Sequence, residues 1–223
     1  MVRPARLILA IPVVATLVGL SIWAFKLGES ETLAYEATRQ LSSWQAAQVS
    51  PGLETWLRVR GELEAAHRLA RKNASVEELL GLLHAERRRN VDFQQIAVEH
   101  FVSALVLRPS SPYTWANIAE VRYRLGATSG DFEQVLTTAA YLGPNEPEVQ
   151  RLVVDLGFAL WDEIGAPSRA AVLRSLTLGM QRNPLEMLQI SDRRGRLDLA
   201  CPRVPADARF LGPEWAKLCE KTA

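Results

Sequence analysis

The chain has 223 residues, 48% of them hydrophobic and 23% charged, which suits a globular protein of one or two domains with a sizeable core. Its formal net charge is +1. Because an electrostatic nucleic-acid surface requires a marked basic excess, this balance excludes such a surface, and we expect no nucleic-acid partner.

The first predicted element is a membrane-spanning helix, carried by the apolar run Leu7–Phe25. As a helix this run covers roughly 30 Å, the thickness of the hydrocarbon core of a bilayer. Arg3 and Arg6 precede the run, and Glu29 and Glu31 follow it. The positive-inside rule then puts the N-terminus in the cytoplasm and the rest of the chain across the membrane. We therefore assign residues 1–28 to a transmembrane anchor.

Two other interpretations of this run remain open. A cleavable signal peptide has a shorter apolar core and a small-x-small cleavage site, and the sequence Ile22-Trp-Ala-Phe-Lys26 lacks that site. A helix buried in a protein core is the second alternative. We favour the uncleaved anchor because of the length of the run and its N-terminal position.

Residues 29–73 are predicted to form a helical hairpin or linker. Ser30–Gln48 has apolar residues at helical spacing and can continue the anchor helix. Ser50 and Pro51 suit the start of a second helix, because serine caps helix N-termini and proline favours the first helical position. This second helix is expected to end near Lys72–Asn73.

Residues 74–184 carry a pattern typical of tetratricopeptide repeats, which are helix-turn-helix units of about 34 residues. Small residues at 97 and 104 allow two helices to approach closely, and Phe101 fills the space between them. Pro109, Pro144 and Pro184 each end the second helix of a repeat unit, at intervals of 35 and 40 residues. A capping box is predicted at Ser75–Glu78. We expect an all-α fold: one transmembrane helix followed by a tetratricopeptide-like solenoid.

The first helix of the central repeat is predicted to present a protein-binding surface. In tetratricopeptide repeats the first helices line the concave face, and the positions expected to point inward here are Tyr113, Asn117, Glu120 and Arg124. Asn117 can form a bidentate hydrogen bond with a bound peptide backbone. The alternative is that Asn117 forms a hydrogen bond across its own helices.

Residues 185–223 are predicted to be a C-terminal cap. Leu185–Arg193 suits a short helix, Leu197–Val204 an extended or irregular segment, and Pro213–Lys221 a last short helix. Cys201 and Cys219 are the only cysteines, and their spacing does not suit a zinc site. They form a disulfide if this part of the chain lies in an oxidising compartment, or they remain two free thiols; the sequence leaves both open.

The sequence contains little that predicts catalysis. No phosphate-binding loop, nucleophile elbow or dinucleotide-binding motif is present, and no motif indicates a cofactor or a metal. His67, His84 and His100 are scattered through helical segments and suit packing or surface positions better than metal coordination. We therefore expect a non-enzymatic protein. The acidic residues Glu146, Glu148 and Asp155 suit helix capping better than catalysis.

Several segments together resemble the VpsP-type polysaccharide-biosynthesis proteins. They are Leu107–Asn117, Tyr123–Gly126, Leu142–Gln150, Asp155–Trp161 and the region around Cys201. Members of this family share a single N-terminal membrane helix and a repeat domain, and are encoded with exopolysaccharide synthesis genes. The resemblance implies a pathway and an inner-membrane location with a periplasmic repeat domain. It implies no catalytic residue.

These observations predict a membrane-anchored scaffold in exopolysaccharide biosynthesis or export, with another protein of that machinery as its partner. An adaptor for a different envelope assembly process is the alternative within the same class. A carbohydrate-binding or carbohydrate-active protein is the alternative from another class. It would use clustered carboxylates and exposed aromatic residues such as Tyr113, Tyr123 and Trp161, and catalysis would require two carboxyl groups facing each other across a cleft.

Overall fold

The computed structural model describes residues 4–47, 49–205 and 213–220, and within these ranges all regular structure is helical. The predicted all-α fold class is therefore confirmed. The elements are α1 (Pro4–Ala47), α2 (Leu53–Leu69), α3 (Ala74–Ala85), α4 (Val91–Leu107), α5 (Pro112–Arg124), α6 (Phe132–Leu142), α7 (Pro147–Ala159), α8 (Ala166–Arg182), α9 (Pro184–Arg193), α10 (Leu197–Ala200), the short 3₁₀ helix η1 (Cys201–Arg203) and α11 (Pro213–Glu220).

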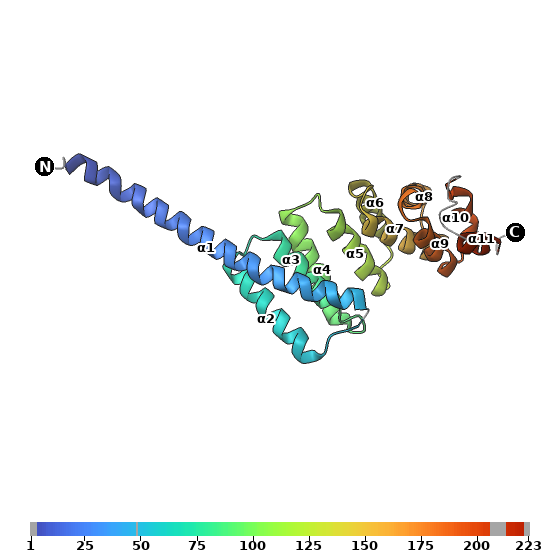
Figure 1. Cartoon of the computed structure of the whole chain (residues 1–223), viewed down its shortest axis with the longest axis horizontal. Helices are drawn as coiled ribbons and strands as arrows, with labels where there is room; N and C mark the ends of the chain where they lie inside the picture. The colour runs from blue at the N-terminus through green and yellow to red at the C-terminus, as the bar shows by residue number, and fades with distance from the viewer. Residues whose placement is uncertain (1–3, 48, 206–212, 221–223) are drawn as a thin grey trace.

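Helix α1 is a single helix of 44 residues whose N-terminal half extends away from the rest of the molecule (Figure 1). Its stretch Ile11–Trp44 contains an apolar window long enough to cross a membrane, and none of that window is buried. The hydroxyls of Thr16 and Ser21 donate to the carbonyls of Pro12 and Leu17, one turn earlier. These polar groups are therefore satisfied within the helix, as a lipid environment requires.

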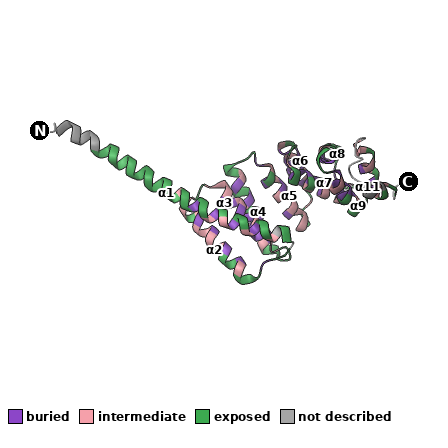
Figure 2. Cartoon of the chain, in the orientation of Figure 1, coloured by how far each residue is buried: buried purple, intermediate pink, exposed green. Residues whose placement is uncertain are grey.

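The C-terminal half of α1 belongs to the helical domain. Figure 2 shows α1 changing from exposed to partly buried where it meets α2. Ala34, Ala37 and Leu41 are buried there, and α1 contacts both α2 and α3. The Ser30 hydroxyl donates to the Ala66 carbonyl of α2 at 3.0 Å. The predicted continuity of the apolar run with the following helix is confirmed, so no flexible linker separates the two halves of α1.

Helix starts are set by short polar side chains and prolines. Asn73 caps α3 by accepting from the backbone amides of Ser75 and Val76, so the predicted capping box at Ser75 is wrong by two residues. The structure also corrects the bounds of α2. It begins at Leu53 after the N-cap Gly52 rather than at Ser50–Pro51, and it ends at Leu69.

Three helical hairpins follow, formed by α3 with α4, α5 with α6, and α7 with α8. A Cβ atom on Gly81 would lie 2.5 Å from the Phe101 ring, and one on Gly157 would lie 2.2 Å from a Val172 methyl. Glycine is thus required where these helices cross. Ala97 and Phe101 are fully buried, which confirms their predicted place between the helices.

The buried side chains form two clusters. We call the first the N-terminal core; its members come from α1, α2 and α3 and are Ala34, Ala37, Leu41, Trp56, Val59, Leu63, Ala66, Val76, Leu79, Leu80 and Leu83. We call the second the C-terminal core; it extends from Ala85 at the end of α3 to Ala200 in α10. Leu82 packs against both. The boundary between the cores therefore falls within the α3–α4 hairpin.

The C-terminal segment packs on α9. The predicted helix at Leu185–Arg193 is confirmed by α9, and α11 falls within the predicted Pro213–Lys221. Leu197–Val204 was predicted to be extended or irregular, which is wrong, because α10 and η1 occupy most of it. Cys201 and Cys219 form a disulfide with their Cα atoms 5.7 Å apart. This bond ties α11 to the end of α10.

Candidate functional site

The four residues predicted to bind a partner lie along one face of α5, and three of them, Tyr113, Glu120 and Arg124, form side-chain hydrogen bonds within the fold. The Arg124 guanidinium donates to the Ala85 carbonyl at 3.0 Å and to Gln94 Oε1 at 3.3 Å. It also donates to the Glu120 carboxylate one turn earlier. Arg124 thus satisfies a carbonyl at the C-terminal end of α3 and joins α5 to the preceding hairpin.

Tyr113 joins the start of α5 to the start of α7. Its hydroxyl donates to the carboxylate of Glu146, which is the N-cap residue of α7. This hydrogen bond, followed by desolvation through burial, raises the pKa of Tyr113 to about 12. The phenol therefore stays protonated at physiological pH and keeps its role as a donor. The Tyr113 residue as a whole is 39% exposed.

Asn117 is the member of this face that remains available. It lies one turn after Tyr113 and is half-buried. Its amide makes no hydrogen bond with any residue in the described ranges, so the bond across its own helices that we considered is not formed there. Of the four predicted residues, Asn117 is the one whose side-chain donor and acceptor both lack a partner among the residues that the structure describes.

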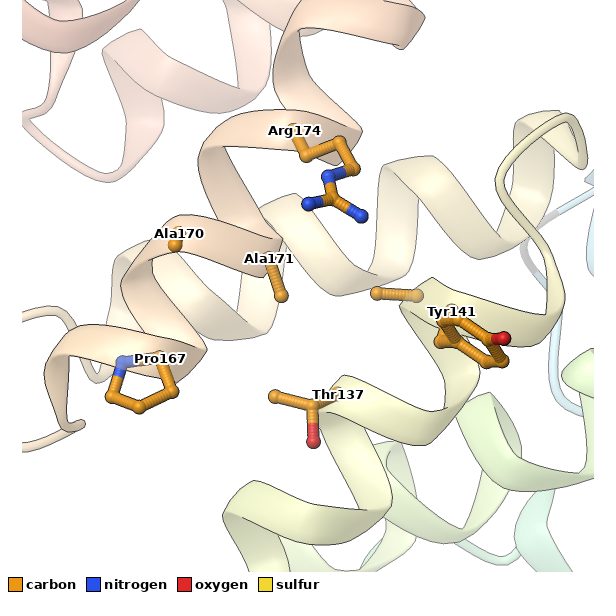
Figure 3. Close-up of a pocket in the computed structure, with 7 residues that line it drawn as sticks. Thr137, Tyr141, Pro167, Ala170, Ala171 and Arg174 are labelled. Carbon is orange, nitrogen blue, oxygen red and sulfur yellow. The ribbon is translucent and has the colours of Figure 1, made fainter.

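A second surface, which the sequence analysis did not identify, is a groove between α6 and α8 (Figure 3). Alanines and a proline form much of its lining. The labelled lining residues are Thr137, Tyr141, Pro167, Ala170, Ala171 and Arg174. Figure 3 shows Thr137 and Ala171 on either side of the space between the two helices. We call this surface the α6–α8 groove.

Tyr141 and Arg174 give the α6–α8 groove its chemical character. Tyr141 is 78% exposed, and its hydroxyl has no partner within the part of the chain that the structure describes. Arg174 is exposed and forms no ion pair with a described residue. An apolar floor beside a free tyrosine and a free guanidinium suits a protein segment that carries small apolar residues and a carboxylate, because tyrosine and arginine are the anchors enriched at protein interfaces.

A sequence signal for Tyr141 existed. Val135, Leu136 and Ala139 follow helical spacing and are buried, whereas Tyr141 falls outside this stripe. An aromatic residue out of phase with the apolar stripe is expected to be exposed. The groove itself had no such signal, since short side chains such as Ala170 and Ala171 also suit a tightly packed helix interface.

Two of the three acidic residues considered above, Glu146 and Asp155, are engaged with other residues, whereas Glu148 is exposed at the start of α7. The Asp155 carboxylate accepts two hydrogen bonds from Arg194, at 2.9 and 2.7 Å. Glu146 accepts the Tyr113 hydroxyl. The aromatic residues are also occupied, because Arg194 lies over the Tyr123 ring and Arg169 lies over the Trp161 ring. These contacts favour a structural role for both sets of residues.

Two of the three histidines, His67 and His100, lie against one buried carboxylate, and the third, His84, stacks on His100. Glu77 of α3 lies 2.8 Å from His100 Nδ1 of α4 and 3.2 Å from His67 Nδ1 of α2. Only the His100 contact has hydrogen-bond geometry, since His67 Nδ1 is buried without such a partner. His84 stacks on His100 with ring centroids 5.5 Å apart. Within the described ranges, no three His, Cys, Asp or Glu side chains are placed to hold a metal ion.

Comparisons with family models, with curated proteins and with solved structures found no match to this chain. The class that the structure defines is an all-α protein with one long, apolar N-terminal helix. The structural features that bear on a more specific function are the long helix α1 and the α6–α8 groove.

Proposed function

We propose that this protein is a single-pass, non-enzymatic membrane adaptor that binds another protein through its helical domain. The observation that carries the proposal is the division of α1. Its apolar first half is exposed, while its second half packs into the N-terminal core without a break in the helix. An exposed apolar helix of this length suits a lipid bilayer, which supports the anchor. The rigid continuation then holds the domain beside the membrane.

The domain is proposed to be a tetratricopeptide-like solenoid. Support comes from the way its hairpins stack. Each of α5 and α7 contacts the first helix of the next unit, α7 and α9 respectively, and α6 contacts α8. Such stacking of neighbouring units buries a continuous core. The C-terminal core, which extends through successive helices from the end of α3 to α10, agrees with this arrangement.

The domain is proposed to lie in the periplasm and the N-terminus in the cytoplasm, in a bacterial inner membrane. The basic residues flanking the apolar run support this orientation, with Arg3 and Arg6 before it and only Lys26 directly after it, ahead of Glu29 and Glu31. The Cys201–Cys219 disulfide independently favours an oxidising compartment for the domain.

The α6–α8 groove is proposed to be the main partner-binding site, with the α5 face around Asn117 as a second contact. The partner is proposed to be a protein of an exopolysaccharide synthesis or export machinery. Only the resemblance of segments such as Leu107–Asn117 to the VpsP-type proteins supports this pathway. The groove supports the protein-binding role, because Tyr141 and Arg174 offer an aromatic surface and a positive charge beside small apolar side chains.

The test is an affinity pull-down of the full-length protein from detergent-solubilised native membranes, followed by mass spectrometry. The proposal predicts recovery of polymerase, export or glycosyltransferase proteins. The double variant Tyr141→Ala/Arg174→Gln should lower that recovery about tenfold or more, as expected for two interface anchors. Asn117→Ala should lower it less, without loss of helicity.

Tyr35→Ala is the matched control, because Tyr35 is 72% exposed on α1 and does not line the groove. Its recovery should equal that of the wild type. Equal recovery by the groove variant and the wild type would remove the groove from the proposal. Recovery of bound oligosaccharide in place of any protein would contradict the adaptor role and favour the carbohydrate-binding alternative.

A further inference from the structure

The unbroken α1 helix sets the distance between the membrane and the domain. The apolar run ends at Phe25, and the first buried contact with α2 is made by Ser30. Five residues of α-helix rise only about 7.5 Å. The headgroup layer of a bilayer extends roughly 5–7 Å beyond the hydrocarbon on each side. The start of the domain therefore lies at or just beyond the lipid headgroups.

Two hydrogen bonds hold the turn between α2 and α3 beside residues 30 and 31 of α1, close to the membrane. The Ser30 hydroxyl donates to the Ala66 carbonyl at 3.0 Å, and the Asn73 amide donates to the Glu31 carboxylate at 2.7 Å. These bonds lie on either side of residues 67–72. Since α1 carries both partners within two adjacent positions, the turn cannot move away from the membrane without breaking them.

This turn carries uncompensated positive charge. Arg68, Arg71 and Lys72 are exposed, and none forms an ion pair with a residue that the structure describes. We call these three residues the basic turn. Long basic side chains extend several ångströms from the backbone and keep their charged ends in water or among headgroups.

The charges on the adjacent part of α1 do not cancel the basic turn. Lys26 is exposed and adds a fourth positive charge. Glu29 and Glu31 are also exposed, but the Glu31 carboxylate already accepts the Asn73 amide. Four positive and two negative side chains leave this edge of the domain at +2, whereas the whole chain has +1. Net positive charge is therefore concentrated where the chain leaves the membrane.

We propose that the basic turn binds anionic phospholipid headgroups of the leaflet from which α1 emerges. This inference rests on the proposed membrane anchoring of α1, and it adds a second membrane contact that a single helix lacks. Each lysine or arginine near an anionic surface strengthens binding roughly fivefold. With α1 and the basic turn both bound to the membrane, the domain has a fixed tilt. The α6–α8 groove is then held at a constant distance from the membrane surface.

The test uses the full-length protein in lipid nanodiscs of phosphatidylcholine alone and of phosphatidylcholine mixed with phosphatidylglycerol. Amide hydrogen exchange of residues 67–73 is measured in both. We expect exchange about fivefold slower or more in the anionic nanodiscs, with the difference lost at high salt, which screens surface charges. The double variant Arg71→Gln/Lys72→Gln should exchange at one rate in both lipids, and Arg71→Lys/Lys72→Arg should behave as the wild type.

The matched control is Arg88→Gln/Arg89→Gln, which removes two adjacent exposed charges from the turn at the other end of α3. This variant should keep the lipid-dependent slowing. Equal exchange of wild-type residues 67–73 in both lipids would overturn the inference, and would favour an acidic protein as the ligand of the basic turn. Vesicle flotation distinguishes failure of the proposed membrane anchor from failure of the headgroup contact. A chain that fails to float with any lipid refutes the anchor. A chain that floats but shows no slowing of hydrogen exchange in residues 67–73 refutes only the contact between the basic turn and the headgroups.

Discussion

The N-terminal and C-terminal cores are stabilised by different kinds of contact. Beside the N-terminal core, polar and titratable groups are buried, with His84 packed on Trp56 and Glu77 paired with His100. The buried polar side chains beside the C-terminal core are uncharged, among them Gln94, Gln150 and Ser191, and its far end is closed by a covalent bond between Cys201 and Cys219. The core that holds the anchor should therefore respond to pH, and the end farthest from the anchor should respond to reducing agents.

Among the variants that test the difference between the two cores, Trp56→Ala has the largest expected effect. Trp56 is 1% exposed, and its indole donates to the Leu83 carbonyl at 2.9 Å. Loss of this side chain should lower the free energy of unfolding by about 3–5 kcal/mol. Hydrogen exchange should rise most in α1, α2 and α3. Trp56→Phe, which keeps an aromatic ring, should lower the free energy of unfolding by less. If hydrogen exchange in α7 and α8 rose as much as in α1, α2 and α3, the two cores would unfold as one unit.

Removal of the disulfide is the next largest change and affects the opposite end. Cys201 and Cys219 are separated by 18 positions, so Cys201→Ser/Cys219→Ser should cost on the order of 3 kcal/mol by the loop-closure argument. Faster exchange is expected in α9, α10 and α11, with α2 unchanged. Thermal unfolding in the presence and absence of a reducing agent checks the same prediction in the wild type. An unchanged melting temperature would contradict it.

The helix crossings within the C-terminal core can be tested by adding one methyl group. Gly157→Ala places a Cβ atom 2.2 Å from Val172, which should destabilise the protein by about 1–3 kcal/mol. Gly61→Ala on α2 is the control, because nothing lies within 4 Å of its added Cβ. That variant should be about 0.5–1 kcal/mol more stable, since alanine favours helix. Chemical denaturation measures both, and equal effects would refute the close crossing.

The smallest predicted effect concerns pH. Burial, followed by the charge of neighbouring His100 and then that of Arg60, lowers the pKa of His84 to about 4, against 6.5 in the unfolded chain. The neutral form is thus favoured by folding. Its contribution to stability is complete above the unfolded pKa and is lost as the pH falls from about 6.5 toward 4. The loss between about pH 7 and pH 5 should be on the order of 1–2 kcal/mol.

His84→Phe tests this prediction, because phenylalanine keeps an aromatic ring beside Trp56 and cannot take up a proton. Denaturation at a series of pH values should show a shallower acid decline for the variant than for the wild type. Glu64 raises the pKa of His84 and belongs to the same environment, so Glu64→Gln should steepen the decline slightly. Identical pH profiles for wild type and His84→Phe would assign the acid response to other groups.

Much of the helical architecture was predictable from local patterns. The prolines at 109, 144 and 184 lie directly beyond or at the start of helices, as their missing amide proton requires. The small and aromatic residues Ala97 and Phe101 occupy the predicted helix crossing. By contrast, the start of α3 was misplaced, because Asn73 and Ser75 are both good capping residues. Asn73 is the residue that also reaches Glu31 of α1, a contact from 42 positions away.

The predicted binding face could be placed from the sequence, but which of its side chains are occupied could not. Helical spacing correctly put Tyr113, Asn117, Glu120 and Arg124 on one side of α5. It could not show that Arg124 reaches Ala85, which is 39 positions earlier in the chain, and is therefore occupied. The α6–α8 groove was not predicted at all, because its alanines have the same local pattern as those of a closed helix interface.

The sequence by itself determined the all-α fold, the apolar helix and most helix ends, since these depend on composition and on contacts within one or two turns. Only the tertiary structure decided which polar groups are free. Arg124 and Asp155 are occupied by partners from distant helices, whereas Asn117, Tyr141 and Arg174 have no side-chain partner within residues 4–47, 49–205 and 213–220. A side chain's availability depends on every element that packs around it, and that information is not contained in any single stretch of the chain.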